Sequence, residues 1–234
     1  MGKRFPLYFW LFTATAAWAF QPDPAALRKL YEDALSRRQQ QYGDSDARTA
    51  QAARDLGLFL CRTADAAGAR RAMLNAVHLD EKALGASNPQ TLEDVAALAS
   101  VSPRAEQEPL LRRAAESPDP TVAGPALTTL AVMRKAAGDV ASAAALFRRA
   151  VEKAEAAEGK DSPTVALILN LLIPLTPPKD AIPLQERALS IDQQTLGPRH
   201  PQTLKDVRQL AALLRATGRT SDAAALEQQF QTGK

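Results

Sequence analysis

The side chains best suited to nucleophilic or acid–base chemistry at neutral pH are the single cysteine, Cys61, and the two histidines, His78 and His200. A catalytic thiol needs a histidine beside it and a third group that orients the histidine, and nothing in the sequence identifies such a set. Cys61 lies in the apolar stretch LGLFLCRT, where we predict a buried structural thiol. We predict that His78 is a partly buried helix residue and that His200 caps a helix.

Motifs of the common catalytic and metal sites are missing from the sequence. It contains no glycine-rich phosphate loop, no HExxH, no cysteine pair for zinc, no GxSxG and no acidic calcium loop. We therefore expect no enzyme, no cofactor and no metal. A hydrolase with an unrecognised site is the alternative, and it would depend on Cys61, His78 or His200.

The N-terminus has the layout of a secretory signal peptide. Lys3 and Arg4 precede an apolar stretch, which ends in the small-x-small triplet Ala17-Trp18-Ala19. This pattern predicts a signal peptide over residues 1–19 and an exported protein, periplasmic or secreted. The apolar stretch is shorter than the roughly 20 residues that a membrane-spanning helix needs, and an uncleaved membrane anchor is the alternative.

Charge and cysteine content narrow the function classes. The formal net charge of the 234 residues is +3, and loss of Lys3 and Arg4 with the signal peptide leaves +1. A nearly neutral mature chain does not favour nucleic acid as a partner. With one cysteine the chain forms no internal disulfide, so packing alone must hold it together.

One phrase occurs twice in the chain, 112 positions apart: LGASNPQTLEDVAALA over residues 84–99 and LGPRHPQTLKDVRQLA over residues 196–211. Each phrase begins with a leucine and a glycine that can end a helix, because glycine accepts a positive φ. A capping residue and a proline follow, and proline suits the first position of a helix. Four such pairs mark helix starts: Asn88-Pro89, Asp119-Pro120, Ser162-Pro163 and His200-Pro201.

These boundaries predict a leading helix over residues 24–42 and then five helical hairpins, which start near residues 45, 89, 120, 163 and 201. Glycine joins the two helices of a hairpin at Gly68, Gly138 and Gly218. The hairpins that start near 89 and 163 are about four residues short, which is one helical turn. Prolines that include Pro103 and Pro174 lie where the missing turn would be.

The spacing of Ala143, Phe147 and Ala150 and the LGxxxPxT corners resemble the tetratricopeptide repeat, and units near 42 residues resemble the subclass found in kinesin light chains. The likeness covers roughly Leu27 to Phe230. It implies an all-α fold, a right-handed α-solenoid of antiparallel helical hairpins, in one domain over residues 20–234. In such a stack each hairpin buries its apolar face against its neighbours.

The resemblance also implies a site, because the first helix of every hairpin lines the concave side of such a stack. It places these residues in the groove, together with Glu93: Arg54, Arg62, Lys135, Asn170, Lys205, Arg208 and Arg215. A groove of this basic character suits an acidic segment or a carboxylate terminus. Exposed lysine and arginine also serve as ordinary solubilising residues, and that alternative stays open.

We therefore expect a non-enzymatic, exported adaptor that binds a peptide or protein in the concave groove, where an acidic partner would fit, with no membrane span after signal cleavage. The alternative is a structural or oligomeric scaffold subunit of a cell-envelope assembly, in which exposed apolar surfaces mediate stacking. The sequence identifies neither the partner nor the oligomeric state.

Overall fold

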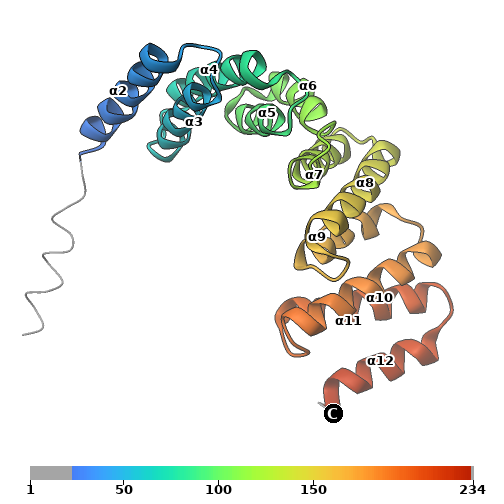
Figure 1. The fold of residues 1–234 in the computed structure, drawn as a ribbon. Helices are drawn as coiled ribbons and strands as arrows, with labels where there is room; N and C mark the ends of the chain where they lie inside the picture. The colour runs from blue at the N-terminus through green and yellow to red at the C-terminus, as the bar shows by residue number, and fades with distance from the viewer. Residues whose placement is uncertain (1–22, 233–234) are drawn as a thin grey trace, which may run out of the picture. The chain divides into compact units, whose positions relative to one another are not determined.

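The computed structural model describes residues 23–232, so the signal peptide predicted for residues 1–19 lies outside the described residues (Figure 1). Residues 23–232 form eleven α-helices and one 3-10 helix and contain no strand, which confirms the predicted all-α helical-repeat fold. Their bounds are α2 Pro24–Tyr42, α3 Ala47–Arg62, α4 Ala66–Leu84, α5 Pro89–Val101, α6 Arg104–Ala114, α7 Pro120–Ala136, α8 Val140–Glu158, α9 Pro163–Leu172, η1 Ile173–Leu175, α10 Pro178–Thr195, α11 Pro201–Ala216 and α12 Thr220–Thr232.

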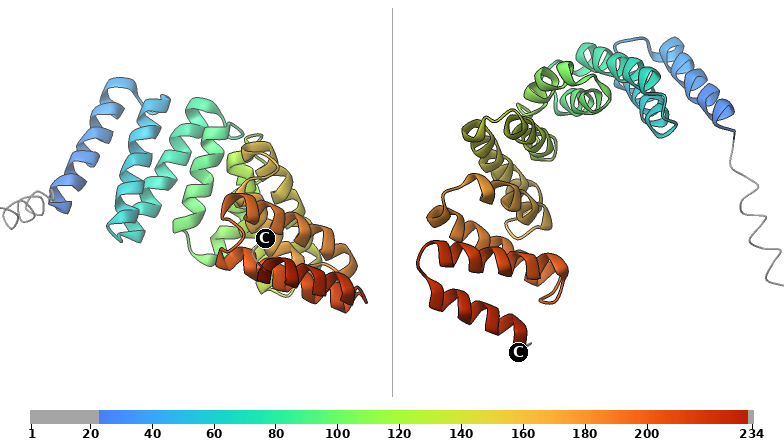
Figure 2. Two further views of the ribbon diagram at one scale, coloured as in Figure 1. Left: turned by 90° about the horizontal axis from the view of Figure 1, so that it is seen from below. Right: turned by 180° about the vertical axis from the view of Figure 1, so that it is seen from behind.

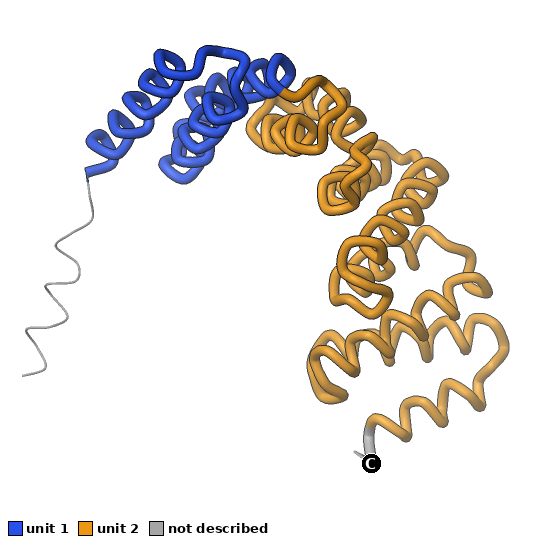
Figure 3. The backbone as a smooth tube through the Cα atoms, in the orientation of Figure 1, with its two compact units in different colours: residues 1–83 blue, residues 84–234 orange. Residues whose placement is uncertain are grey.

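The helices group into two compact units, residues 1–83 and 84–234 (Figure 3). In unit 1, α2 packs beside α3 (Figure 2). In unit 2, each helix from α5 to α12 packs against the next one, and α11 and α12 form the last hairpin (Figure 2). A single domain over residues 20–234 stays a prediction.

Small residues let the helices of unit 2 approach closely. Ala143, Phe147 and Ala150 on α8 are fully buried, and Leu127 and Ala131 on α7 are fully buried as well. Phe147 fills the space that the alanines leave between these two helices. The interior is therefore built mainly from alanine and leucine, with few aromatic rings.

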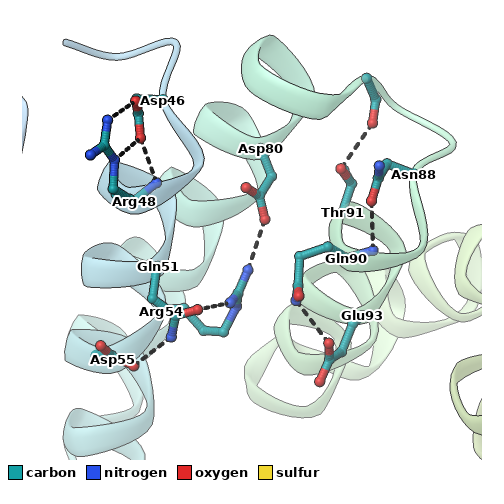
Figure 4. Close-up of polar contacts among 11 residues, drawn as sticks. Asp46, Arg48, Gln51, Arg54, Asp55, Asp80, Asn88, Gln90, Thr91 and Glu93 are labelled. Atoms are coloured by element: carbon teal, nitrogen blue, oxygen red, sulfur yellow. Dashed lines mark hydrogen bonds and ion pairs between the residues drawn. The ribbon is translucent and has the colours of Figure 1, made fainter. Parts of the chain in front are cut away.

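The repeated LGxxxPxT phrase forms a hydrogen-bonded corner between two helices. Gly85 has a φ of +94°, and its carbonyl accepts a hydrogen bond from Thr91 Oγ1 at 2.8 Å (Figure 4). Asn88 Oδ1 accepts a hydrogen bond from Gln90 N, which caps α5. The same two bonds form at the corner before α11, where Thr203 donates to the Gly197 carbonyl at 2.8 Å and His200 caps the helix.

A third corner, before α3, follows the same plan although its sequence lacks the proline. Thr49 Oγ1 donates to the Gly43 carbonyl at 2.8 Å, and Asp46 accepts from Arg48 N. Each of these threonines is fully buried, so the bond to the glycine carbonyl satisfies a hydroxyl that water cannot reach. The duplicated phrase is therefore an architectural joint.

The shortened first helices are present where the sequence predicts them. Helix α5 has 13 residues and α9 has 10, against 17 in α7 and 16 in α11. Pro174 lies in the 3-10 helix that follows α9. Proline cannot donate the backbone hydrogen bond that would continue the α-helix, so α9 ends at Leu172.

The prediction that Gly68 forms a hairpin turn is wrong. Gly68 lies inside α4, where its N–H donates to Asp65 Oδ1 at 2.8 Å and where a β-carbon would collide with the Asp65 carboxylate. The turn between α3 and α4 instead uses Ala64, whose φ is +60°. Gly138 and Gly218 take the equivalent positions in later turns, with φ of +82° and +84°.

We predict that Ala64→Gly stabilises the protein, because a positive φ is unfavourable for alanine and not for glycine. The gain should be about 0.5–1 kcal/mol, since glycine also loosens the unfolded chain. The reciprocal change Gly138→Ala should cost roughly 1 kcal/mol by the same reasoning. Urea denaturation measures both, and a loss of stability in Ala64→Gly would contradict the strain at Ala64.

Candidate functional site

In unit 1, a buried ion pair joins the two helices of the first hairpin. Arg54 on α3 and Asp80 on α4 lie 2.8 Å apart, from Nη2 to Oδ2, and their side chains are only 11% and 1% exposed (Figure 4). Arg54 Nη1 also donates to Gln51 Oε1 at 2.5 Å. Because a buried carboxylate is costly without a cation, Arg54 is needed here as the counter-ion of Asp80.

Unit 2 contains a second copy of this arrangement with one decisive change. Arg54 stands eight residues after the helix cap Asp46, and Asn170 stands eight residues after the helix cap Ser162. Asp80 lies five residues before the corner glycine Gly85, as Asp192 does before Gly197. The second copy therefore has a neutral amide where the first has the guanidinium.

Asp192 is only 5% exposed, and its carboxylate forms no ion pair within residues 23–230. Asn170 Oδ1 is buried and has no hydrogen-bond partner in that range. The second copy thus keeps the buried carboxylate and lacks its cation.

A pocket of about 450 Å³ opens at this point between α9, α10 and α11. Its lining residues are Pro163, Leu167, Asn170 and Leu171 from α9, Asp192 and Leu196 from α10, and Gln202 and Lys205 from α11. All of them belong to unit 2. In the same unit, α5, α7 and α9 lie along the inner side of the curve that its helices follow (Figure 1).

A second buried carboxylate, Asp206 on α11, lies behind the pocket. Asp206 is fully buried, and burial together with the neighbouring Asp192 carboxylate raises its pKa to about 7. Gln202 Nε2 donates to Asp206 Oδ1 at 3.0 Å, while Asp206 Oδ2 has no hydrogen-bond partner within the described residues. Two carboxyl groups that share one low-dielectric space resist double ionisation, so the pair retains a proton up to a pH of about 7.

The structure separates the groove residues implied by the resemblance into three groups. Arg54 and Arg215 are held in intramolecular ion pairs, Arg215 with Glu227 of α12 at 2.6 Å, which lowers the pKa of Glu227. Asn170 is half-buried in the pocket wall. The other four implied residues are exposed cations that form no ion pair within residues 23–230: Arg62 in unit 1, and Lys135, Lys205 and Arg208 in unit 2.

Sequence reasoning missed Asp192 and Asp206, which are the two buried acids of the site. The signal was present in the repeat, because Asp80 and Asp94 stand 112 positions before them. An aspartate in a helix usually faces solvent, and only a comparison of the two copies marks these positions as constrained.

None of the three residues considered for chemistry lines this pocket. Cys61 is exposed, so the prediction of a buried thiol is wrong: α3 buries Phe59 and Leu60, and the next side chain turns outward. His78 is exposed, which also contradicts its prediction, whereas His200 caps α11 as predicted. Within the described residues no group of three or more His, Cys, Asp or Glu side chains could hold a metal ion.

Comparison with known families identifies the class. Residues 126–164 and residues 178–230 each match a family model of the tetratricopeptide repeat. These two segments are therefore tetratricopeptide repeats, and such repeats indicate an adaptor or scaffold for protein–protein interaction. A search of curated proteins found no match.

Two solved structures share the fold. BtubC (BKLC) from P. vanneervenii is 19% identical, with a TM-score of 0.63, over 89% of this chain and 88% of that chain. TPR-like repeats of a Podosopora anserina protein described as a kinesin light chain are 20% identical, with a TM-score of 0.53, over 78% of this chain and 92% of that chain. The resemblance to kinesin light chain repeats is thus confirmed for the fold. None of the described helices is long and apolar enough to cross a membrane.

We predict that Arg54→Ala destabilises the protein by about 3–5 kcal/mol, because it leaves the Asp80 carboxylate buried without its counter-ion. Arg62→Ala is the matched control on the same helix, since Arg62 is exposed, and it should change the free energy of unfolding by less than about 0.5 kcal/mol. Guanidinium denaturation measures both. Equal effects of the two substitutions would contradict the structural role of Arg54.

The raised pKa of Asp206 predicts a pH dependence of stability. The pKa of the Asp206 carboxyl is 3.8 in the unfolded chain and about 7 in the folded chain, so between these pH values the unfolded chain releases the carboxyl proton while the folded chain keeps it. Asp206 therefore lowers the free energy of unfolding as pH rises from 3.8 to about 7. Asp206→Asn should therefore raise the melting temperature relative to wild type by roughly 2–4 °C at pH 8 and by less at pH 5. Asp161→Asn, at an exposed site, is the control. A pH-independent difference would refute the shift.

Proposed function

We propose that this protein is an exported, non-enzymatic adaptor that binds an extended, acidic segment of a partner protein along α7, α9 and α11 of unit 2. The observation that carries the proposal is the pair of exposed cations Lys135 on α7 and Arg208 on α11, neither of which has an ion pair within residues 23–230. Cations that no intramolecular carboxylate neutralises are available to a ligand. The half-buried amide of Asn170 on α9 adds a group that can bond a peptide backbone.

The chemistry of such a surface favours carboxylates. Lysine and arginine form charge-assisted hydrogen bonds with a carboxylate, and these bonds are about twice as strong as neutral ones. Exposed charges mainly raise the association rate and set the choice of partner, and they contribute modestly to affinity. Arg54 and Arg215 are left out of the binding surface because their guanidinium groups already serve Asp80 and Glu227.

Export is the second part of the proposal. It is supported by the basic start, the apolar stretch and the small-x-small triplet within residues 1–19. We infer that the binding face then operates outside the cytoplasm, in the periplasm or beyond.

A scaffold that assembles with itself is the alternative, and unit 1 offers an observation in its favour. Leu30 on α2, Leu58 on α3 and Leu74 on α4 are 56%, 45% and 51% exposed. Exposed apolar side chains of this size suit contact with a second protein surface. An apparent mass that rises with protein concentration would favour this alternative over a monomeric adaptor.

Charge reversal tests the adaptor. The variant Lys135→Glu/Arg208→Glu should recover about tenfold less partner from cell extract than the unaltered chain, because two attractive contacts become repulsive. The control Arg148→Glu/Lys179→Glu reverses two exposed charges on the second helices α8 and α10 and should capture partner normally. Helicity by circular dichroism should be equal in all three proteins.

Retained proteins are identified by mass spectrometry, and a bound segment rich in Asp and Glu is the expected result. Equal capture by both variants would exclude the α7–α9–α11 face as the binding surface.

A further inference from the structure

The pocket between α9 and α11 is lined by two hydrogen-bond acceptors, the carboxylate of Asp192 and the amide oxygen of Asn170. Asp192 lines it with a carboxylate that is 5% exposed and forms no ion pair within residues 23–230. Asn170 lines it too, and its Oδ1 atom is buried without a hydrogen-bond partner in the described chain. A buried carboxylate is stabilised by a nearby cation that also donates hydrogen bonds, so the pocket suits a positively charged donor.

The first copy of the repeat shows which donor fits. There the Arg54 guanidinium donates to the Asp80 carboxylate and to the amide oxygen of Gln51. Asn170 replaces this arginine in the second copy, and the shorter side chain coincides with a pocket of about 450 Å³. A guanidinium has five N–H donors and no acceptor, which matches a carboxylate and an amide oxygen.

The mouth of the pocket is apolar. Leu167 and Leu196, which are 61% and 44% exposed, line it together with Pro163 and Leu171. Arginine carries its charge on an aliphatic stem that can pack along such residues while the head reaches a carboxylate. The pocket therefore matches both ends of the side chain.

We propose that the pocket receives an arginine side chain of the partner, whose guanidinium binds Asp192 and Asn170 as Arg54 binds Asp80 and Gln51 in the first copy. This inference rests on the proposed function, because it names one side chain of the segment that the adaptor binds. The segment would then place this arginine between the carboxylates that Lys135 and Arg208 attract.

The charged groups around the site determine its pH dependence. Helix α9 carries no titratable side chain, α10 contributes Asp192, and α11 contributes Lys205 and Asp206, with His200 at its cap. A guanidinium beside the two carboxylates favours their full ionisation, so binding below about pH 7 releases the proton that the pair holds there. Affinity should rise by up to about tenfold between pH 6 and pH 8. Lys205 is exposed at the pocket and competes, so Lys205→Ala should strengthen binding.

The test uses N-acetyl-L-arginine N-methylamide as the probe and the citrulline analogue, which has the same shape without the charge, as its matched control. Both are titrated into the isotopically labelled full chain while the side-chain amide resonances of Asn170 and Gln202, which line the pocket, are followed by NMR. We expect the arginine probe to bind at least tenfold more strongly than the citrulline probe. Asp192→Asn should abolish that preference, whereas Asp161→Asn should keep it.

Asn170→Arg supplies the guanidinium from within the chain and gives an independent readout. It should remove probe binding and raise the melting temperature at pH 8, as expected if its side chain pairs with Asp192. Equal binding of the two probes, or unchanged binding in Asp192→Asn, would overturn the arginine site.

These outcomes are separate from those of the proposed function. If Lys135→Glu/Arg208→Glu loses partner capture and the arginine probe does not bind the unaltered chain, the adaptor function stands and the arginine pocket is rejected. If the probe binds and that variant captures partner normally, the arginine pocket stands and the proposed role of Lys135 and Arg208 is rejected.

Discussion

The burial of aspartate side chains between consecutive helices is the constraint that shapes the polar part of this structure. In the first hairpin the Asp80 carboxylate lies inside, and Arg54 reaches across from the neighbouring helix to neutralise it. Such a pair stabilises the fold little beyond what an apolar pair would, but removal of either partner leaves an isolated buried charge. The arginine is therefore fixed in place and is not available to a ligand.

The second copy meets the same constraint in another way. Asp192 and Asp206 lie close together with amides around them, and a retained proton substitutes for the missing cation. This arrangement keeps the site neutral enough to fold while leaving room in the pocket. A difference of one residue, Arg54 against Asn170, thus separates a position that holds a buried ion pair from a position that lines an open pocket.

The fold could be predicted from the sequence to a large extent because its signals are local. A glycine with positive φ, a cap and a proline lie within a few residues of one another, and they mark the starts of α5 and α11 without any knowledge of the rest of the chain. The turn at Ala64 was missed because the same geometry is there imposed on an ordinary residue. Cys61 was misplaced because an apolar stretch of a helix still has an outward face.

The candidate site was less accessible to such reasoning. The ion pair of Arg54 joins residues 26 positions apart, and that of Arg215 joins residues 12 positions apart. Sequence identifies a charged residue on a helix face, but it does not tell whether another helix supplies the opposite charge. Hence the prediction of seven groove residues included two whose charges the fold already uses.

The corner threonines have a consequence for how such chains change over evolutionary time. Thr91 and Thr203 bond to carbonyls six residues earlier, so this bond closes each joint within its own short segment. A joint of this kind can be copied, moved or deleted with its hairpin as a module. Helix α9 is short at the end far from its joint, so a change of helix length at that end alters the surface of one module and leaves its joint intact.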